Sequence, residues 1–344
     1  MTSAIRAADF PFFPSVFLIG APRCGTTSLS KLLGRHPEIC FSRPKELNYF
    51  GQVSTDGLVN IQHDYLDRYF QHYDPERHRV AAEGSVTYLY DPEALKQIKA
   101  IQPDARFLVA VRNPIDMLRS FHFRMLYLLE EDETNFETAW ALQEVRAQGQ
   151  RIPKRCSDPR RLRYREVASL GAQVERLVQT VGRDRCHIVV NDDVRSDPVV
   201  TCQDMLRFCG VNDDLHALAE IDATNPFPHR HKSRTYRWRW LQQILYKPPA
   251  IALRSAARSE VRRGVRPLSL KRLHKKLSRL NLVKGEAPRF SPEFKQRLVE
   301  EFDQDIAVLE GILDRDLNAW RQISSNTPKP VDPAQRDHSL GATQ

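Results

Sequence analysis

The fold of this chain is decided by the stretch VFLIGAPRCGTTS at residues 16–28. Its apolar start predicts a buried strand, its two glycines predict a tight loop, and the hydroxyl residues that follow predict the first turn of a helix. Gly20 and Gly25 let the backbone approach an anion closely, and the free N–H groups at a helix N-terminus favour negative charge. The stretch therefore predicts a phosphate-binding loop.

This loop departs from the ATP-binding pattern G-x-x-x-x-G-K-[ST], in which the lysine reaches the terminal phosphates and the hydroxyl holds magnesium. Thr26 stands where that lysine belongs, and the cation of the loop is Arg23 instead. The phosphate cradle is kept, but the lysine of nucleotide hydrolases is lost. A P-loop kinase or ATPase is thus a disfavoured alternative, which magnesium-dependent turnover of ATP would revive.

Short apolar strands alternate with longer helical patterns over the rest of the chain. This alternation predicts an α/β fold of the P-loop type, in which a central parallel sheet is flanked by helices in three layers. The predicted strands are 16–19, 80–82, 107–111 and 187–190, and the predicted helices are 26–35, 92–100, 114–129, 198–208 and 292–313. Four of these helices begin at a proline, which favours the first position of a helix.

With 344 residues and 41% hydrophobic content, the chain is long enough to bury a large core. We expect a single domain over 1–324, with a core over 14–212, a basic and helical C-terminal part over 213–324, and a disordered tail over 325–344. The six cysteines show no C-x-x-C pair and no zinc spacing, so we expect reduced thiols and no metal site. No run approaches the ~20 apolar residues of a membrane span. Together these features predict a cytoplasmic protein.

Positive charge is concentrated late in the chain. The basic block 229–284 contains seventeen Lys or Arg residues and one acid, Glu260, so that the rest of the chain carries −7 of the formal total of +9. Such a block attracts polyanions, phosphorylated cofactors or anionic lipid. One interpretation is peripheral contact with the inner face of a membrane. A non-catalytic polyanion-binding protein is a second alternative function, although we do not expect nucleic acid to be the partner.

A second motif follows the predicted strand 107–111. Arg112-Asn113-Pro114 is followed by Ser120, two helical turns into the next helix, so that a guanidinium and a hydroxyl can reach one phosphate together. In combination with the 16–28 loop, this motif resembles the sulfotransferases that use 3′-phosphoadenosine 5′-phosphosulfate (PAPS), especially the heparan sulfate and bacterial carbohydrate branch. The resemblance covers about Val16 to Val211, and more weakly continues to Trp320.

The resemblance implies how the cofactor is bound. In that family the first loop holds the 5′-phosphosulfate and the second motif holds the 3′-phosphate, no metal is required, and the product is 3′,5′-adenosine bisphosphate (PAP). A later segment, Lys232-Ser233-Arg234, resembles the K-G-R loop that closes over the cofactor, with serine in place of glycine. The implied cofactor-binding residues are Arg23, Cys24, Gly25, Thr26, Thr27, Ser28, Arg112, Ser120, Lys232 and Arg234.

The resemblance also assigns the catalytic groups. Lys45-Glu46 resembles the segment that carries the catalytic base, which makes Glu46 the group that takes the acceptor proton. Arg23 is permanently charged, so we expect it to stabilise the leaving phosphosulfate oxygen. Lys45 either holds the acceptor or tunes the base, and the sequence leaves both roles open.

The implied reaction transfers a sulfuryl group from PAPS to a hydroxyl or amine, and we expect a carbohydrate acceptor, with a small molecule as the other choice. Glu83 lies in a segment that resembles the family's E-K-[ST]-P-x-Y stretch, but Gly84 stands where several relatives carry lysine. The candidate acceptor-binding residues are Lys45, Glu83, Arg124 and Arg155. The sequence leaves open the acceptor's identity, the sulfated atom and the oligomeric state.

Overall fold

The computed structural model describes residues 6–51, 61–218, 220–227, 234–246, 277–287 and 289–322. The predicted tail 325–344, most of the basic block and the cofactor candidate Lys232 lie outside these residues.

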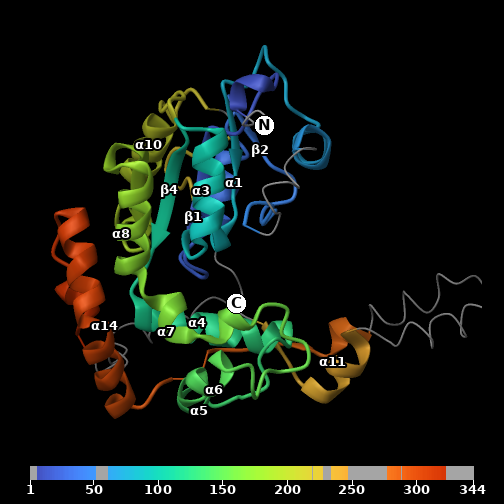
Figure 1. Ribbon diagram of the computed structural model, residues 1–344, viewed down its shortest axis with the longest axis vertical. Coiled ribbons are helices and arrows are strands. Elements are labelled where there is room, and N and C mark those ends of the chain that lie inside the picture. Colours follow the sequence, from blue (N-terminus) through green and yellow to red (C-terminus); the bar gives the residue numbers. More distant parts are fainter. Residues whose placement is uncertain are drawn as a thin grey trace, which may run out of the picture.

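A five-stranded parallel sheet forms the centre of the fold, with strands in the order β2-β3-β1-β4-β5 (Figure 1). The strands are β1 Val16–Gly20, β2 Ile39–Phe41, β3 Val80–Glu83, β4 Arg106–Val111 and β5 Cys186–Val190. Every residue of β1, β2 and β3 is buried, as expected for a parallel sheet covered on both faces. The predicted α/β class with a central parallel sheet is therefore confirmed.

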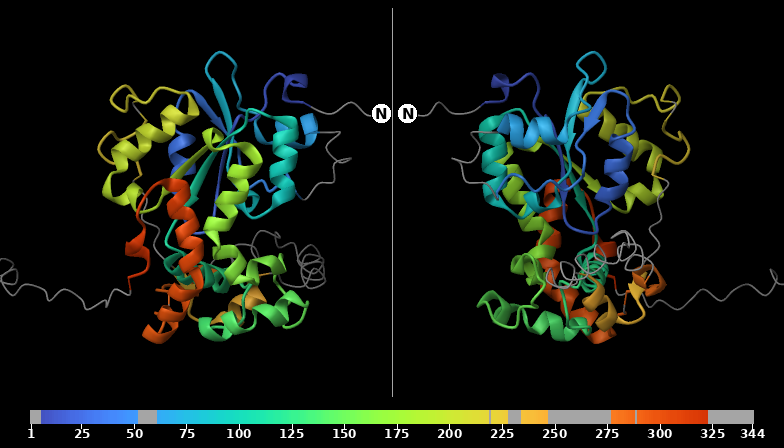
Figure 2. Two further views of the ribbon diagram at one scale, coloured as in Figure 1. Left: turned by 60° about the vertical axis from the view of Figure 1, so that its left-hand side comes forward. Right: turned by 90° about the vertical axis from the view of Figure 1, so that its right-hand side faces the viewer.

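Helices cover both faces of this sheet. Figure 2 shows α1 and α10 on one face and α3 on the opposite face, where α3 contacts α8. The larger helices are α1 Thr26–Leu33, α3 Pro92–Ile101, α4 Pro114–Leu128, α8 Leu170–Val181, α10 Pro198–Cys209 and α14 Pro292–Leu313. The shorter ones are α2 Asp67–Tyr69, α5 Phe136–Ala141, α6 Gln143–Ala147, α7 Tyr164–Ala168, α9 Asp193–Ser196 and α11 Arg239–Tyr246.

The four proline-started helices begin where the sequence predicts. In each, the residue before the proline accepts a hydrogen bond from a backbone N–H of the first turn, which satisfies a donor that has no partner inside the helix. These capping residues are Asp91, Asn113, Asp197 and Ser291. The cap and the proline thus fix each helix start locally.

The long C-terminal helix α14 packs against α8 beside the sheet (Figure 1). Its predicted apolar stripe is buried throughout and consists of Phe294, Leu298, Phe302, Ile306 and Leu309. At the contact, the Asp305 carboxylate accepts hydrogen bonds from the N–H groups of Gly171 and Ala172 at 2.8 and 2.9 Å. Asp305 of α14 therefore caps the N-terminus of α8.

Below the carboxyl ends of the strands in Figure 1 lie α4, α5, α6, α7 and α11. A small antiparallel pair, β6 Arg234–Tyr236 and β7 Leu282–Lys284, also belongs to this part of the described chain. Because α4 starts at the end of β4, this layer faces the phosphate-binding loop predicted from the sequence. The space between the sheet edge and this layer is where a ligand site is expected in an α/β fold.

Gly20 is required where β1 ends. Its φ is +142°, and a Cβ there would lie 2.4 Å from the carbonyl oxygen of Ala110 in the neighbouring strand. We expect Gly20→Ala to lower the free energy of unfolding by at least about 2 kcal/mol, since both the backbone conformation and the clash are unfavourable. Urea denaturation of Gly20→Ala and of Gly311→Ala tests this. Gly311 lies in α14 with open space around it, so an equal loss in both variants would contradict the explanation.

Candidate active site

The 16–28 stretch forms the predicted loop between β1 and α1. Gly25 is the N-cap of α1 and has φ +97°, and a Cβ there would lie 2.9 Å from Asn191 Nδ2. Arg23 also has a left-handed backbone, with φ +69°. Such conformations are costly for residues other than glycine and concentrate at functional sites. The loop thus places a helix N-terminus and a guanidinium together at the sheet edge, where both favour an anion.

The two motifs identified in the sequence meet at this loop. Arg23 Nε donates a hydrogen bond to Ser120 Oγ at 2.9 Å, and Arg112 Nη1 donates to the Arg23 carbonyl at 3.4 Å. Desolvation lowers the pKa of Arg23, and the nearby charges of Arg124 and Arg112 lower it further. Three guanidinium groups therefore create a strongly positive field beside the loop.

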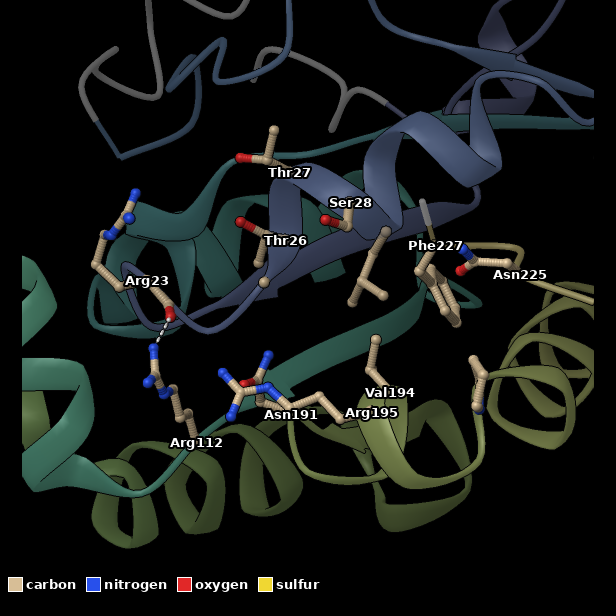
Figure 3. Close-up of a pocket in the computed structure, with 13 residues that line it drawn as sticks. Arg23, Thr26, Thr27, Ser28, Arg112, Asn191, Val194, Arg195, Asn225 and Phe227 are labelled. Carbon is tan, nitrogen blue, oxygen red and sulfur yellow. Dashed lines mark hydrogen bonds between the residues drawn. The ribbon is translucent and has the colours of Figure 1, made fainter. Parts of the chain in front are cut away.

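A cavity of about 720 Å³ opens on the α1 side of the loop (Figure 3). Figure 3 shows Arg23 and Arg112 at one end and Asn225 and Phe227 at the other. The lining residues are Arg23, Gly25, Thr26, Thr27, Ser28, Leu29, Arg112, Asn191, Val194, Arg195, Pro198, Asn225 and Phe227. Volumes of this order suit a nucleotide-sized ligand.

Several residues that line this cavity are not predicted from the sequence as part of the site. Asn191 directly follows β5, and its Nδ2 donates to the Cys24 carbonyl at 3.3 Å, whereas its buried Oδ1 has no hydrogen-bond partner among the described residues. Its place at the carboxyl end of a parallel strand is a signal that sequence reasoning could have used. Asn225 and Phe227 lie in an irregular stretch that offers no comparable signal.

A second cavity, of about 800 Å³, lies on the other side of the loop and shares Arg23, Thr26 and Thr27 with the first. We call it the acceptor cleft, after the ligand that the resemblance leads us to expect. Its other lining residues are Pro22, Lys45, Glu46, Asn48, Val86, Thr87, Tyr90, Phe121, Arg124, Leu128, Ser157, Asp158, Arg161 and Val167. Two ligands bound in the two cavities would therefore meet at the loop.

Glu46 is held at this meeting point by its backbone and its side chain. Its φ is +66°, its N–H donates to the Gly84 carbonyl at 2.8 Å, and its Oε2 accepts from the Val86 N–H at 3.0 Å. Its Oε1 pairs with Lys45 Nζ, which also donates to Thr26 Oγ1 at 3.3 Å. Lys45 thus links the predicted base directly to the first turn of α1.

Glu83 does not face either cavity, contrary to the expectation that it contacts the acceptor. Its side chain is fully buried, and its carboxylate accepts hydrogen bonds from Tyr65, Ser85 and Tyr88. Ser85 Oγ in turn accepts from the Asn48 N–H at 3.0 Å. Glu83 therefore holds Ser85, and through it the backbone of the segment that contains Glu46 and Asn48.

The remaining predicted site residues differ in their positions. Arg124 lines the acceptor cleft, as expected of an acceptor-binding residue. Arg155 donates instead to the Gln243 carbonyl of α11 and lines neither cavity, so the structure does not support its predicted role. Arg234 lies in β6, also outside both cavities, and its contact with the cofactor stays a prediction. Cys24 is buried and its thiol pKa is raised to about 12, which leaves only its backbone for the cofactor.

The parallel sheet, its flanking helices and the loop before α1 define a P-loop-like fold. Residues 13–239 match the sulfotransferase domain family, and the chain belongs to this family. A sulfotransferase from Alicyclobacillus acidocaldarius shares the fold, with a TM-score of 0.60 and 23% identity over 90% of this chain and 99% of that one.

Two curated relatives are similar over shorter segments. Human carbohydrate sulfotransferase 15 is 29% identical over 148 residues, which cover 31% of this chain and 26% of the relative. The membrane-associated sulfotransferase kil1 of Dictyostelium discoideum is 25% identical over 117 residues, which cover 33% of this chain and 24% of the relative. The chain thus spans about a quarter of the length of these relatives.

Two kinds of feature are absent from the described residues. No group of three or more His, Cys, Asp or Glu side chains suited to a metal ion occurs among them. None of their helices combines the length and apolarity that crossing a membrane requires.

Proposed function

We propose that this protein transfers the sulfuryl group of PAPS to a hydroxyl or amine of an acceptor. The observation that carries this proposal is the meeting of two cavities at Arg23, Thr26 and Thr27, with Glu46 in the lining of the second cavity only. A donor in one cavity and an acceptor in the other would have their reacting ends at the loop. Family membership supports the same donor, since sulfotransferases of this family use PAPS.

The residues of the first cavity fit this cofactor. The α1 N-terminus and Arg23 would hold the phosphosulfate, Arg112 would hold the 3′-phosphate, and the Phe227 ring offers a surface for a base. Ser120 lines neither cavity and accepts a hydrogen bond from Arg23, so its contact with the 3′-phosphate stays a prediction. The unpartnered Asn191 Oδ1 provides a polar contact inside the same cavity. When bound, the cofactor supplies the sulfuryl group and a phosphate leaving group.

In the proposed reaction, Glu46 accepts the proton of the attacking acceptor on a carboxylate oxygen. The Arg23 guanidinium neutralises the charge that develops where the phosphate departs, and it does so without a proton transfer, because arginine is a poor acid. Lys45 contacts both Glu46 and Thr26, so it would add a second positive charge near the reacting groups. Positioning and electrostatics, with no covalent enzyme intermediate, then supply the acceleration.

We propose that the acceptor is a carbohydrate. The cleft combines the rings of Tyr90 and Phe121 with hydroxyl, amide and charged groups, a mixture suited to the apolar faces and hydroxyls of sugars. The similarity to the human carbohydrate sulfotransferase supports the same class. A cytoplasmic site of action stays a prediction.

Arg124 gives this proposal a specific test. Arg124 lines the cleft, so its guanidinium can bind an acidic group of the acceptor. The guanidinium lies 5.1 Å from the centre of the Tyr127 ring. We expect Arg124→Gln to raise KM for an acidic oligosaccharide by about 10–100-fold, because one charged hydrogen bond is lost. The affinity for PAP should be unchanged. Steady-state kinetics with matched acidic and neutral acceptors measure this. An equal rise in KM for the neutral acceptor would contradict an anion-binding role.

Calorimetric titration separates the proposed function from its alternatives. We expect the protein to bind PAP without magnesium and to bind ADP much more weakly, since ADP lacks the 3′-phosphate for Arg112. Tight, magnesium-dependent ADP binding with ATP turnover would support a kinase or ATPase instead. Binding of heparin but of no nucleotide would support a non-catalytic polyanion-binding protein.

A further inference from the structure

Residues 234–246 and 277–287 form a small substructure, which we call the β6–β7 unit, in the lower part of the molecule in Figure 1. Its strands pair antiparallel, with Arg234 opposite Lys284 and Tyr236 opposite Leu282. The turn after β6 is fixed by Asn281, whose Oδ1 accepts from the Trp238 N–H at 2.8 Å and whose Nδ2 donates to the Trp238 carbonyl at 2.9 Å. The backbone of this turn is thus held by bonds that do not involve the Trp238 ring.

The unit is attached firmly to the layer that lines the acceptor cleft. The Tyr236 ring stacks on Tyr127 of α4, with centroids 5.0 Å apart and planes 8° from parallel. Arg239 Nη2 donates to the Glu131 carbonyl at 2.8 Å. A Cβ on Gly285 would lie 3.1 Å from Phe123 of α4, which shows how closely the unit approaches that helix. These contacts fix the backbone of the unit against α4, and so fix the positions from which its exposed side chains project.

Large apolar side chains are exposed on this unit to an unusual degree. Trp240 is 62% exposed, Trp238 48%, Leu280 67% and Leu277 38%. They are four of the six exposed large hydrophobic residues in the described part of the chain. Because exposed tryptophan is costly in water, a concentration of this kind marks an interaction surface.

The charges of the unit indicate the chemistry of its partner. Its exposed charged residues are Arg234, Arg237, Arg279 and Lys284 against Glu286. In sequence, residues 247–276 join its two halves and add ten Lys or Arg and one acid, Glu260. Tryptophan prefers the headgroup region of a bilayer, and Lys and Arg are attracted to anionic lipid. An anionic membrane surface satisfies both kinds of side chain at once.

We propose that the β6–β7 unit docks on an anionic lipid bilayer, with Trp238 and Trp240 in the headgroup region and the basic residues against lipid phosphates. Tyr127, which stacks on Tyr236, also lies beneath the guanidinium of Arg124, so docking brings the acceptor cleft near the bilayer. The surface itself does not depend on the proposed transfer activity. A protein that bound PAP but not vesicles, or the reverse, would distinguish the two proposals.

Vesicle sedimentation of the full-length protein tests the docking surface, with vesicles of phosphatidylcholine alone and of phosphatidylcholine mixed with phosphatidylglycerol. We expect binding to the anionic vesicles at physiological salt and a partition coefficient lowered at least about tenfold in the Trp238→Ala/Trp240→Ala variant. Leu280→Ser provides a second, milder variant, which we expect to weaken binding in the same direction. Val308→Ser removes an exposed apolar side chain from α14, outside the β6–β7 unit, and controls for the loss of any exposed apolar group.

Each contrary result has a defined meaning. Unchanged vesicle binding by folded tryptophan variants would overturn the proposal, because the basic residues alone would then account for it. A wild-type dimer that the tryptophan variant converts to a monomer, without vesicle binding, would assign the surface to a second copy. Binding of soluble heparin without binding of vesicles would assign it to a polyanion. Circular dichroism of every variant shows that the fold is retained.

Discussion

Glu46→Gln should retain the fold and the affinity for PAP while the rate of sulfuryl transfer falls by about 10²–10⁴-fold, the usual contribution of a general base. The glutamine amide keeps the size of the side chain and the hydrogen bond from the Val86 N–H, but it cannot accept the acceptor proton. Single-turnover transfer at saturating PAPS measures the effect on the chemical step. Because the carboxylate also pairs with Lys45, PAP binding must be measured for the same variant.

Glu175→Gln provides the matched control, since Glu175 is an exposed carboxylate on α8, outside both cavities. We expect wild-type transfer from this variant. Transfer by Glu46→Gln at more than about one tenth of the wild-type rate would assign the proton to another group, because a base contributes at least about 100-fold. A Glu46→Gln variant that no longer binds PAP would instead show that the Glu46-Lys45 pair organises the loop.

Arg23→Ala should lower kcat by about 10²–10³-fold, because it removes the charge that, in the proposed reaction, stabilises the leaving oxygen. Arg23 lines both cavities, and its side chain is oriented by Ser120 Oγ. We expect Ser120→Ala to have a smaller effect on kcat, because the charge of Arg23 is kept and only one of its hydrogen bonds is lost. Steady-state kinetics and PAP titration of both variants separate the loss of rate from the loss of affinity.

Arg35→Ala controls for the removal of a positive charge, since Arg35 is exposed just beyond the opposite end of α1. We expect it to transfer at the wild-type rate. A large drop in PAP affinity with unchanged kcat in Arg23→Ala would make this residue a binding group only.

Local signals predicted the parts of the fold and the site that lie within short stretches of sequence. The loop before α1 is specified by Gly20, Gly25 and the hydroxyl residues after them, and α4 is specified by Asn113 and the proline that follows. Arg112 and Ser120 can be predicted as a pair because both lie on one strand–helix unit. In each case the residues that form the feature are close together in the sequence, so the feature can be predicted without knowing the tertiary contacts.

The features that the sequence does not predict depend on residues far apart in the chain or on very short segments. Helix α8 has no capping side chain of its own at its start, because Asp305 of α14 supplies it from 134 residues away. The three-residue strand β2 is too short to show a period. Burial of Glu83 follows from its bonds to Tyr65 and Tyr88, which no spacing in the sequence reveals. Tertiary contacts therefore decided these features.

Transfer of labelled sulfuryl from PAPS to a panel of acidic and neutral glycans, run with wild type, Glu46→Gln and Glu175→Gln, tests the central claim most directly. The account predicts labelled glycan from wild type and Glu175→Gln, formed without magnesium, and little from a folded, PAP-binding Glu46→Gln. Label transferred equally by Glu46→Gln would contradict the assigned base. Absence of both PAP binding and transfer in the wild-type protein would contradict the proposed function itself.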